Sequence, residues 1–124
     1  MNDDKKKEEL FFSGLNAYAE GKYFDAHEIW EELWSEYYLK DRDFIKGLIQ
    51  LAVCFVHLEN GNMYGAWSLL NKSTKKLIGF SKDHRNINVK ELMKALNELY
   101  INLETINNAE EFDWSTCPKI LLNE

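Results

Sequence analysis

Apolar side chains recur every three or four positions through most of the chain, which is the spacing of amphipathic α-helices. The first run, with Leu10, Phe11, Leu15 and Tyr18, predicts a helix over residues 5–19. Similar runs predict helices over residues 23–38, from 42 or 43 to 59, over 63–78 and over 89–107. The pattern therefore predicts a compact all-α bundle of about five helices.

Glycines and polar residues mark the ends of these segments. Gly21, Gly61 and Gly79 follow the first, third and fourth helices, where glycine commonly ends a helix. Asp41 or Asp43 is the expected cap of the third helix. The polar segment 81–88 is predicted to be a loop with a solvated His84, and residues 108–124 an extended strap packed on a single domain spanning 1–124.

The chain contains an internal repeat at an offset of 40 residues. The run 21–26 aligns with 61–66, and the pair Ile29-Trp30 aligns with Leu69-Leu70. Each unit consists of a helix, a glycine turn and a second helix. This arrangement predicts two tetratricopeptide-like helical hairpins, which bury their apolar faces by stacking.

Composition narrows the choice of fold and location. One proline and six glycines in 124 residues are too few for a turn-rich β-sandwich. A net charge of −6 argues against broad nucleic-acid binding as a function class. Two cysteines do not make a disulfide scaffold. The charged N-terminus is not followed by the apolar core of a signal peptide, and the longest apolar stretch, residues 48–58, is far shorter than a membrane span. The expectation is a cytoplasmic protein that does not contact membranes.

The candidate chemistry begins in the second predicted helix. A helical projection separates a wide apolar face from the acidic side chains on the opposite face. His27 and Glu31 lie one turn apart at the boundary, with Trp34 beside them. An imidazole and a carboxylate placed in this way can converge on one point.

The third predicted helix is apolar nearly all round, except for one narrow polar strip. The strip consists of Asp43, Lys46, Gln50, Cys54 and His57. Polar groups on a buried helix need partners, because an unpaired buried amide or imidazole costs roughly 1–3 kcal/mol. We therefore expect this strip to face the His27/Glu31 edge of the preceding helix.

Two blocks of sequence resemble a known family. The run 21–34, Gly-Lys-Tyr-Phe-Asp-Ala-His-Glu-Ile-Trp-Glu-Glu-Leu-Trp, and the run 47–52, Gly-Leu-Ile-Gln-Leu-Ala, are similar to the bacterial and archaeal Domain of Unknown Function 309 family. Gly61-Asn62, Gly65-Ala66 and the tail Pro118-Lys119-Ile120 add to the resemblance. The resemblance implies a small all-helical fold and a His-x-x-x-Glu-x-x-Trp motif for which metal binding has been suggested, without an established activity.

Two functions remain open at this stage. In the first, His27, Glu31 and His57 hold a divalent metal such as zinc or iron, or line a small-molecule site, with Trp34, Gln50, Cys54 and Glu28 around it. In the second, the chain is a non-enzymatic interaction module, and the same residues form a structural hydrogen-bond network. No phosphate loop or nucleophile triad names a reaction, so the sequence does not decide whether the protein is an enzyme.

Charge is distributed unevenly along the chain. Six acidic residues lie between 20 and 36, and six basic residues lie between 72 and 90. These clusters are either two solvated faces or complementary patches on two copies of the chain. The second interpretation predicts a homo-oligomer.

Overall fold

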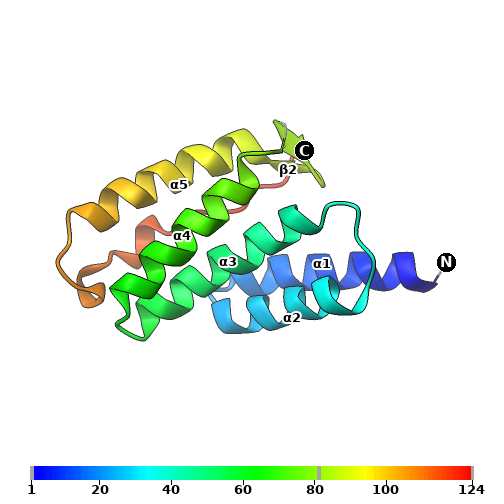
Figure 1. Cartoon of the computed structure of the whole chain (residues 1–124), viewed down its shortest axis with the longest axis horizontal. Helices are drawn as coiled ribbons and strands as arrows, with labels where there is room; N and C mark the ends of the chain where they lie inside the picture. Colours follow the sequence, from blue (N-terminus) through cyan, green and yellow to red (C-terminus); the bar gives the residue numbers. More distant parts are fainter. Residues whose placement is uncertain (1, 81, 124) are drawn as a thin grey trace.

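A computed structural model describes residues 2–80 and 82–123 of the chain. Within these residues the main elements are five α-helices: α1 (Asn2–Ala19), α2 (Tyr23–Glu36), α3 (Arg42–Glu59), α4 (Met63–Leu77) and α5 (Val89–Glu104). The predicted all-α class is confirmed, and most helix ends agree with the prediction to within three residues. In Figure 1, α3 runs through the middle, with α1 and α2 below it and α4 and α5 above it.

A glycine turn joins α1 to α2, and a matching glycine turn joins α3 to α4. Gly21 and Gly61 both have φ of 76°, a left-handed conformation that glycine adopts at little cost. The main-chain N–H of Gly21 donates to Tyr18 and that of Gly61 donates to Leu58, so the hydrogen bonds repeat at the same offset as the sequence. The repeat seen in the sequence is therefore a repeat of turn geometry. Stacking of the tetratricopeptide type stays a prediction.

The core is rich in aromatic rings, and a glycine allows two helices to pack closely around one of them. Trp30 is fully buried, and its indole N–H donates a 3.1 Å hydrogen bond to the main-chain oxygen of Phe11. A Cβ at Gly14 would lie 2.1 Å from the indole nitrogen of Trp30. Glycine at position 14 is therefore what lets α1 and α2 approach each other around this ring.

The segment between α4 and α5 differs from the loop predicted over residues 81–88. Ser81 lies outside the described residues. The segment forms a short antiparallel hairpin from β1 (Asp83–His84) and β2 (Ile87–Asn88). Arg85 and Asn86, at the tip, have φ of 49° and 61°, as a tight primed turn requires.

The hairpin is attached to the start of α3 through Asp41. The Asp41 carboxylate accepts a 2.8 Å hydrogen bond from His84 and a 3.1 Å hydrogen bond from Arg85 Nη2. The prediction that His84 is simply solvated was therefore wrong. Asp41 does occupy the cap position of α3, but its side chain makes no capping hydrogen bond because the hairpin engages it instead.

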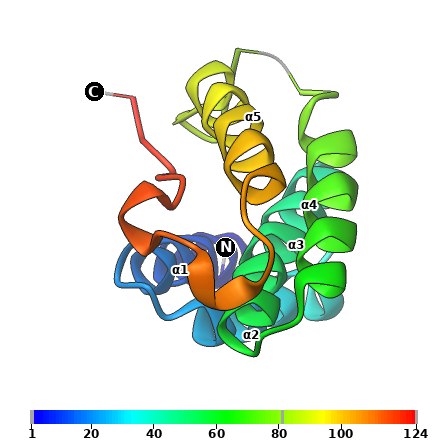
Figure 2. The same cartoon turned by 90° about the vertical axis from the view of Figure 1, so that its left-hand side faces the viewer.

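The chain after α5 runs back along the bundle. It contains two short 3₁₀ turns, η1 (Ala109–Glu111) and η2 (Trp114–Thr116), and then continues without helix. The Tyr18 hydroxyl donates a 2.7 Å hydrogen bond to the main-chain oxygen of Pro118, and Phe112 is buried near Phe55. Figure 2 shows this segment passing in front of α1. We call residues 108–123 the strap.

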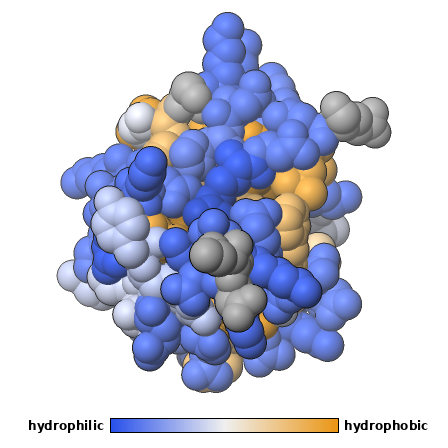
Figure 3. Space-filling model, turned by 90° about the vertical axis from the view of Figure 1, so that its right-hand side faces the viewer, coloured by the Kyte–Doolittle hydropathy of each residue, from blue (hydrophilic) through white to orange (hydrophobic). Residues whose placement is uncertain are grey.

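The surface of the bundle is mixed in character. Figure 3 shows that the end of the molecule carrying the start of α1 is mainly hydrophilic, with smaller apolar patches between the polar side chains. Among the described helices, none has the length and apolar character needed to cross a bilayer.

Candidate functional site

The His-x-x-x-Glu-x-x-Trp motif lies on α2 where this helix packs on α3. Its tryptophan, Trp34, is locked to the first residue of α3 by two hydrogen bonds. The Trp34 indole N–H donates to the main-chain oxygen of Arg42, and Arg42 Nη1 donates to the main-chain oxygen of Trp34, both at 3.2 Å. The guanidinium also lies 4.0 Å from the centre of the Trp34 ring. Trp34 thus acts as a joint between the two helices.

Glu31, one turn before Trp34 on the motif edge, pairs with the polar strip of α3. Lys46 Nζ lies 3.9 Å from Glu31 Oε2 and 4.5 Å from the centre of the Trp34 ring. The two side chains are 31% and 39% exposed, so solvent weakens the ion pair. This contact confirms at one position that the two polar edges face each other.

The same register places His27 opposite Gln50. His27 is one turn from Glu31 toward the start of α2, and Gln50 is one turn from Lys46 toward the end of α3. Because the two helices are antiparallel, these two positions lie at one level. The close approach of the Tyr23 and Phe55 rings, 4.9 Å between centroids, continues this register by a further turn.

His27 and Gln50 each contain a buried polar atom without a partner. His27 Nδ1 and Gln50 Oε1 are shielded from solvent and accept or donate no hydrogen bond among the described residues. Gln50 as a whole is only 8% exposed, while the His27 ring packs against the ring of Phe24 at 5.7 Å. Neither atom therefore takes part in the structural hydrogen-bond network that the second of the two open functions requires.

His57, the third proposed metal ligand, faces α4 rather than α2. Its Nδ1 lies 3.3 Å from Nδ2 of Asn62, the residue that caps α4 by accepting a hydrogen bond from Gly65. A Cβ at Gly65 would lie 2.7 Å from the His57 ring, so the imidazole fills the space above this glycine. His57 thus belongs to the turn between α3 and α4.

Cys54 and Glu28 also point away from the α2–α3 edge. Cys54 is fully buried, and burial followed by the nearby Cys117 raises the pKa of its thiol to about 12. Glu28 is exposed and lines a groove between α1 and α2 together with Ser13 and Asn16. Neither residue is placed to line a pocket with His27.

The proposed metal centre is not assembled. Across residues 2–80 and 82–123, no group of three or more His, Cys, Asp or Glu side chains is arranged to hold a metal ion. The physical reason is that the other two candidate ligands contact different neighbours instead of pointing toward His27. Glu31 pairs with Lys46, and His57 lies against Asn62 and Gly65, so His27 has no second and third ligand beside it.

Comparison with known proteins identifies the family. Residues 11–69 match the family described as Domain of unknown function (DUF309). The resemblance seen in the sequence is thus confirmed over this segment of the chain. It is also 32% identical over 96 residues to a protein of Bacillus subtilis (strain 168) described as uncharacterized protein YpuF. The alignment covers 73% of this chain and 53% of that relative, so the chain spans about half the length of the curated relative it matches.

The DUF309 segment and the rest of the chain contribute different structural features. Residues 11–69 hold the whole motif edge, from His27 on α2 to His57 on α3. The hairpin, α5 and the strap lie beyond it. Features built from the strap therefore add to what the family segment contains.

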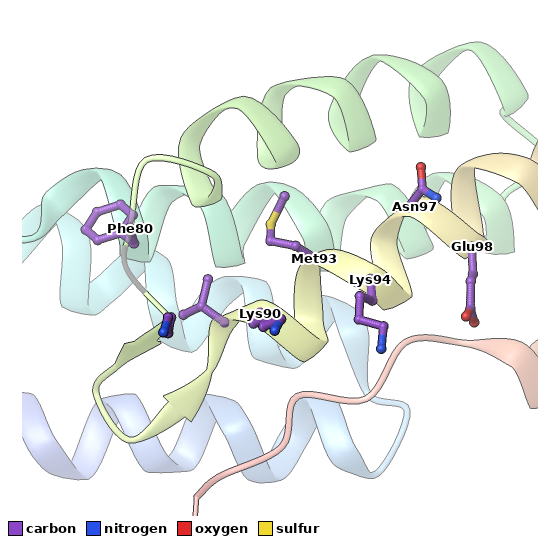
Figure 4. A pocket seen from close by; sticks show the side chains of 8 residues that line it. Phe80, Lys90, Met93, Lys94, Asn97 and Glu98 are labelled. Carbon is purple, nitrogen blue, oxygen red and sulfur yellow. The ribbon is translucent and has the colours of Figure 1, made fainter.

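A basic groove beside α5 also lies outside residues 11–69, and sequence patterns did not single it out (Figure 4). It has a volume of about 560 Å³ and an apolar lining that includes Phe80 and Met93. Lys82, Lys90 and Lys94 also line it. The groove contains part of the basic cluster expected to meet an acidic face on a second copy, and that association stays a prediction.

Proposed function

We propose that the edge between α2 and α3 binds a small polar molecule, which supplies the hydrogen-bond partners that His27 and Gln50 lack. The observation that carries this proposal is the pair of buried, unpartnered atoms, His27 Nδ1 and Gln50 Oε1. The contacts on either side of them, Glu31 with Lys46 and Tyr23 with Phe55, put the two residues at one level of the helix pair. An unpartnered buried polar atom costs about 1–3 kcal/mol, so native proteins keep few of them. Two at one level of one helix pair are best explained by a ligand that pairs with both.

The two atoms define what the ligand must offer. A glutamine side-chain oxygen only accepts hydrogen bonds, so the ligand carries an N–H or O–H donor for Gln50. His27 Nδ1 either donates or accepts, according to its tautomer. The rim of the site holds one charge of each sign, on Glu31 and Lys46, which suits a neutral or zwitterionic ligand.

Access to the site runs through the Glu31–Lys46 pair. The unpartnered atoms are covered in this structure, so a ligand reaches them only when side chains at the rim move. The ion pair is long, at 3.9 Å, and partly exposed, and pairs of this kind contribute at most about 1 kcal/mol. Opening it requires little free energy compared with the two hydrogen bonds gained.

The decisive variant is Gln50→Leu, which removes the unpartnered oxygen and keeps the volume of the side chain. We expect its free energy of unfolding to rise by roughly 1 kcal/mol, measured by urea denaturation. Asn97→Leu, an exposed change on α5, is the control and should leave stability nearly unchanged. A loss of stability in Gln50→Leu would show that the amide has a structural partner in solution and would contradict the proposal.

Binding is tested with the same pair of variants. Thermal-shift screening of small amides, alcohols and amino acids should yield a compound that stabilises the wild type and Asn97→Leu, and that fails to stabilise Gln50→Leu. A set of compounds that stabilises all three proteins equally, or none, would remove the α2–α3 edge as the binding site.

A second function, a non-enzymatic helical interaction module, is supported by the reciprocal bonds between Trp34 and Arg42. These bonds use a motif residue to hold two helices together. If this second function is the correct one, His27→Ala lowers the free energy of unfolding and does not change the thermal shift that any compound produces. The two functions therefore predict opposite signs for the stability of variants at the His27/Gln50 level.

A further inference from the structure

The two glycine turns and the strap line another groove, which we call the turn groove. Its volume is about 580 Å³. Its residues come from the ends of α1 and α3, the start of α2 and the strap. Figure 1 shows the ends of α1 and α3 toward the left of the bundle. The groove is lined by Gly21, Tyr23, Leu58, Glu59, Gly61, Ala109, Glu110 and Trp114.

Trp114 forms an aromatic wall of the turn groove. Its ring stacks on Tyr23, with centroids 5.9 Å apart and planes at 25°, and it meets Phe112 edge-on at 5.0 Å. The Trp114 side chain remains 39% exposed although it is held from these two sides. A fixed, half-exposed indole offers its π-face to a cation.

Two carboxylates on different segments share the groove with this ring. Glu59 ends α3 and Glu110 lies in η1, and neither has an ion-pair partner within the described parts of the chain. Glu110 Oε1 lies 3.4 Å from where a Cβ at Gly61 would be, so this carboxylate sits directly over the turn. The negative potential of Glu59 also reaches the Tyr23 hydroxyl, whose pKa is raised first by burial and further by Cys117 and Glu59.

A second, more apolar cavity adjoins the turn groove at Trp114. Its volume is about 410 Å³, and it lies between α1 and the strap. Tyr23 and Trp114 line both spaces, while Leu15, Pro118 and Ile120 line only the second. An acidic space and an apolar space on either side of one indole suit consecutive side chains of an extended peptide.

We propose that the turn groove binds a basic peptide segment of a partner protein, with an arginine or lysine side chain between Trp114, Glu59 and Glu110. An ammonium or guanidinium group donates a charge-assisted hydrogen bond to each carboxylate and makes a cation–π contact with the indole. A large apolar residue beside the cation enters the cavity along the strap. This site is separate from the α2–α3 edge, so either one can fail without the other.

The test uses two short acetylated peptides, one with arginine followed by leucine, the other with uncharged citrulline in place of the arginine. The amide signals of Gly21 and Gly61 in ¹H–¹⁵N spectra report on the groove, and those of Gly14 and Gly47 serve as internal references within the helices. We expect the arginine peptide to shift Gly21 and Gly61 and to bind at least about tenfold more tightly than the citrulline peptide.

Variants separate the groove from general charge attraction. The double change Glu59→Gln and Glu110→Gln keeps the shape of the groove and should weaken the arginine peptide about tenfold or more. The matched control, Glu98→Gln with Glu104→Gln on α5, removes the same charge and should leave binding within about twofold. Equal binding of both peptides, or equal weakening by both double variants, would overturn the proposal.

Discussion

The Ser73 hydroxyl donates a 2.7 Å hydrogen bond to the main-chain oxygen of Gly47, inside the contact between α3 and α4. Both residues are buried. A Cβ at Gly47 would lie 2.8 Å from two carbon atoms of Leu77, so the absence of a side chain allows the helices to pack this closely. The central helix is thus positioned by a glycine and a hydroxyl rather than by large apolar side chains alone.

We predict that Gly47→Ala destabilises the protein. Alanine favours a helix by about 1 kcal/mol over glycine, but the added methyl group must displace Leu77 from a fully packed core. The net loss should be roughly 1–3 kcal/mol, measured by urea denaturation. Gly79→Ala is the control, since its nearest contact would be an ordinary 3.6 Å, and a comparable loss there would contradict this explanation.

Arg42→Lys tests the joint between α2 and α3. Lysine keeps the positive charge but cannot reproduce the geometry by which Arg42 bonds to Trp34 and covers its ring. We expect a loss of about 1 kcal/mol. A double-mutant cycle with Trp34→Phe measures the coupling, and two effects that simply add would show that the residues act independently.

Asp41 gives stability a defined dependence on acid pH. Burial raises the pKa of this carboxyl, but hydrogen bonds from Arg85 and His84 outweigh burial and lower it to about 2 from 3.8. The stabilisation is therefore complete above about pH 4 and is lost as the pH falls toward 2. We expect the urea midpoint of Asp41→Asn to be lower at pH 7, and to change less than that of the wild type between pH 4 and 2.

The control for this prediction is Asp25→Asn, an exposed change on α2. It should leave the difference between pH 4 and pH 2 as it is in the wild type. If Asp41→Asn and the wild type lose stability in parallel over this range, the hairpin attachment does not contribute in the way the structure indicates.

The two thiols should be slow to alkylate in the folded protein. Burial raises the pKa of Cys117 to about 11, since its hydrogen bond with Tyr23 only partly opposes burial, and burial raises the pKa of Cys54 to about 12. The thiolate is the reactive form, so iodoacetamide at pH 8 should modify both at least about a hundredfold more slowly than free cysteine. Mass spectrometry over time measures the rates, with urea-unfolded protein as the control. Rapid modification of folded Cys117 would show that the strap opens readily.

Much of the fold follows from local patterns in the sequence. Helix α5, for example, was predicted from a single leucine stripe and starts at Val89 as expected. Its end was predicted at residue 107, but the helix stops at Glu104 because Thr105 closes the last turn onto Asn102. Polar residues near a helix end compete for its main chain in this way, and periodicity alone does not detect that.

The candidate site was predicted less completely. The α2–α3 edge was found because polar residues on a largely apolar helix need partners. Which partners they take was missed, since Glu31 pairs with Lys46 and His57 turns toward Gly65. Such choices depend on which side chains meet first in space, and several chemically acceptable partners lay within the same two helices.

By itself, the sequence determined the helices, the glycine turns and the exceptional polar edge, because each depends on residues within a few turns of one another. Only the tertiary structure decided the rest. Asp41 binds His84 across 43 positions, and Tyr23 meets Cys117 across 94. Nothing in the local pattern records these pairs, since they form only when packing of the apolar faces has fixed where each helix end and the strap lie.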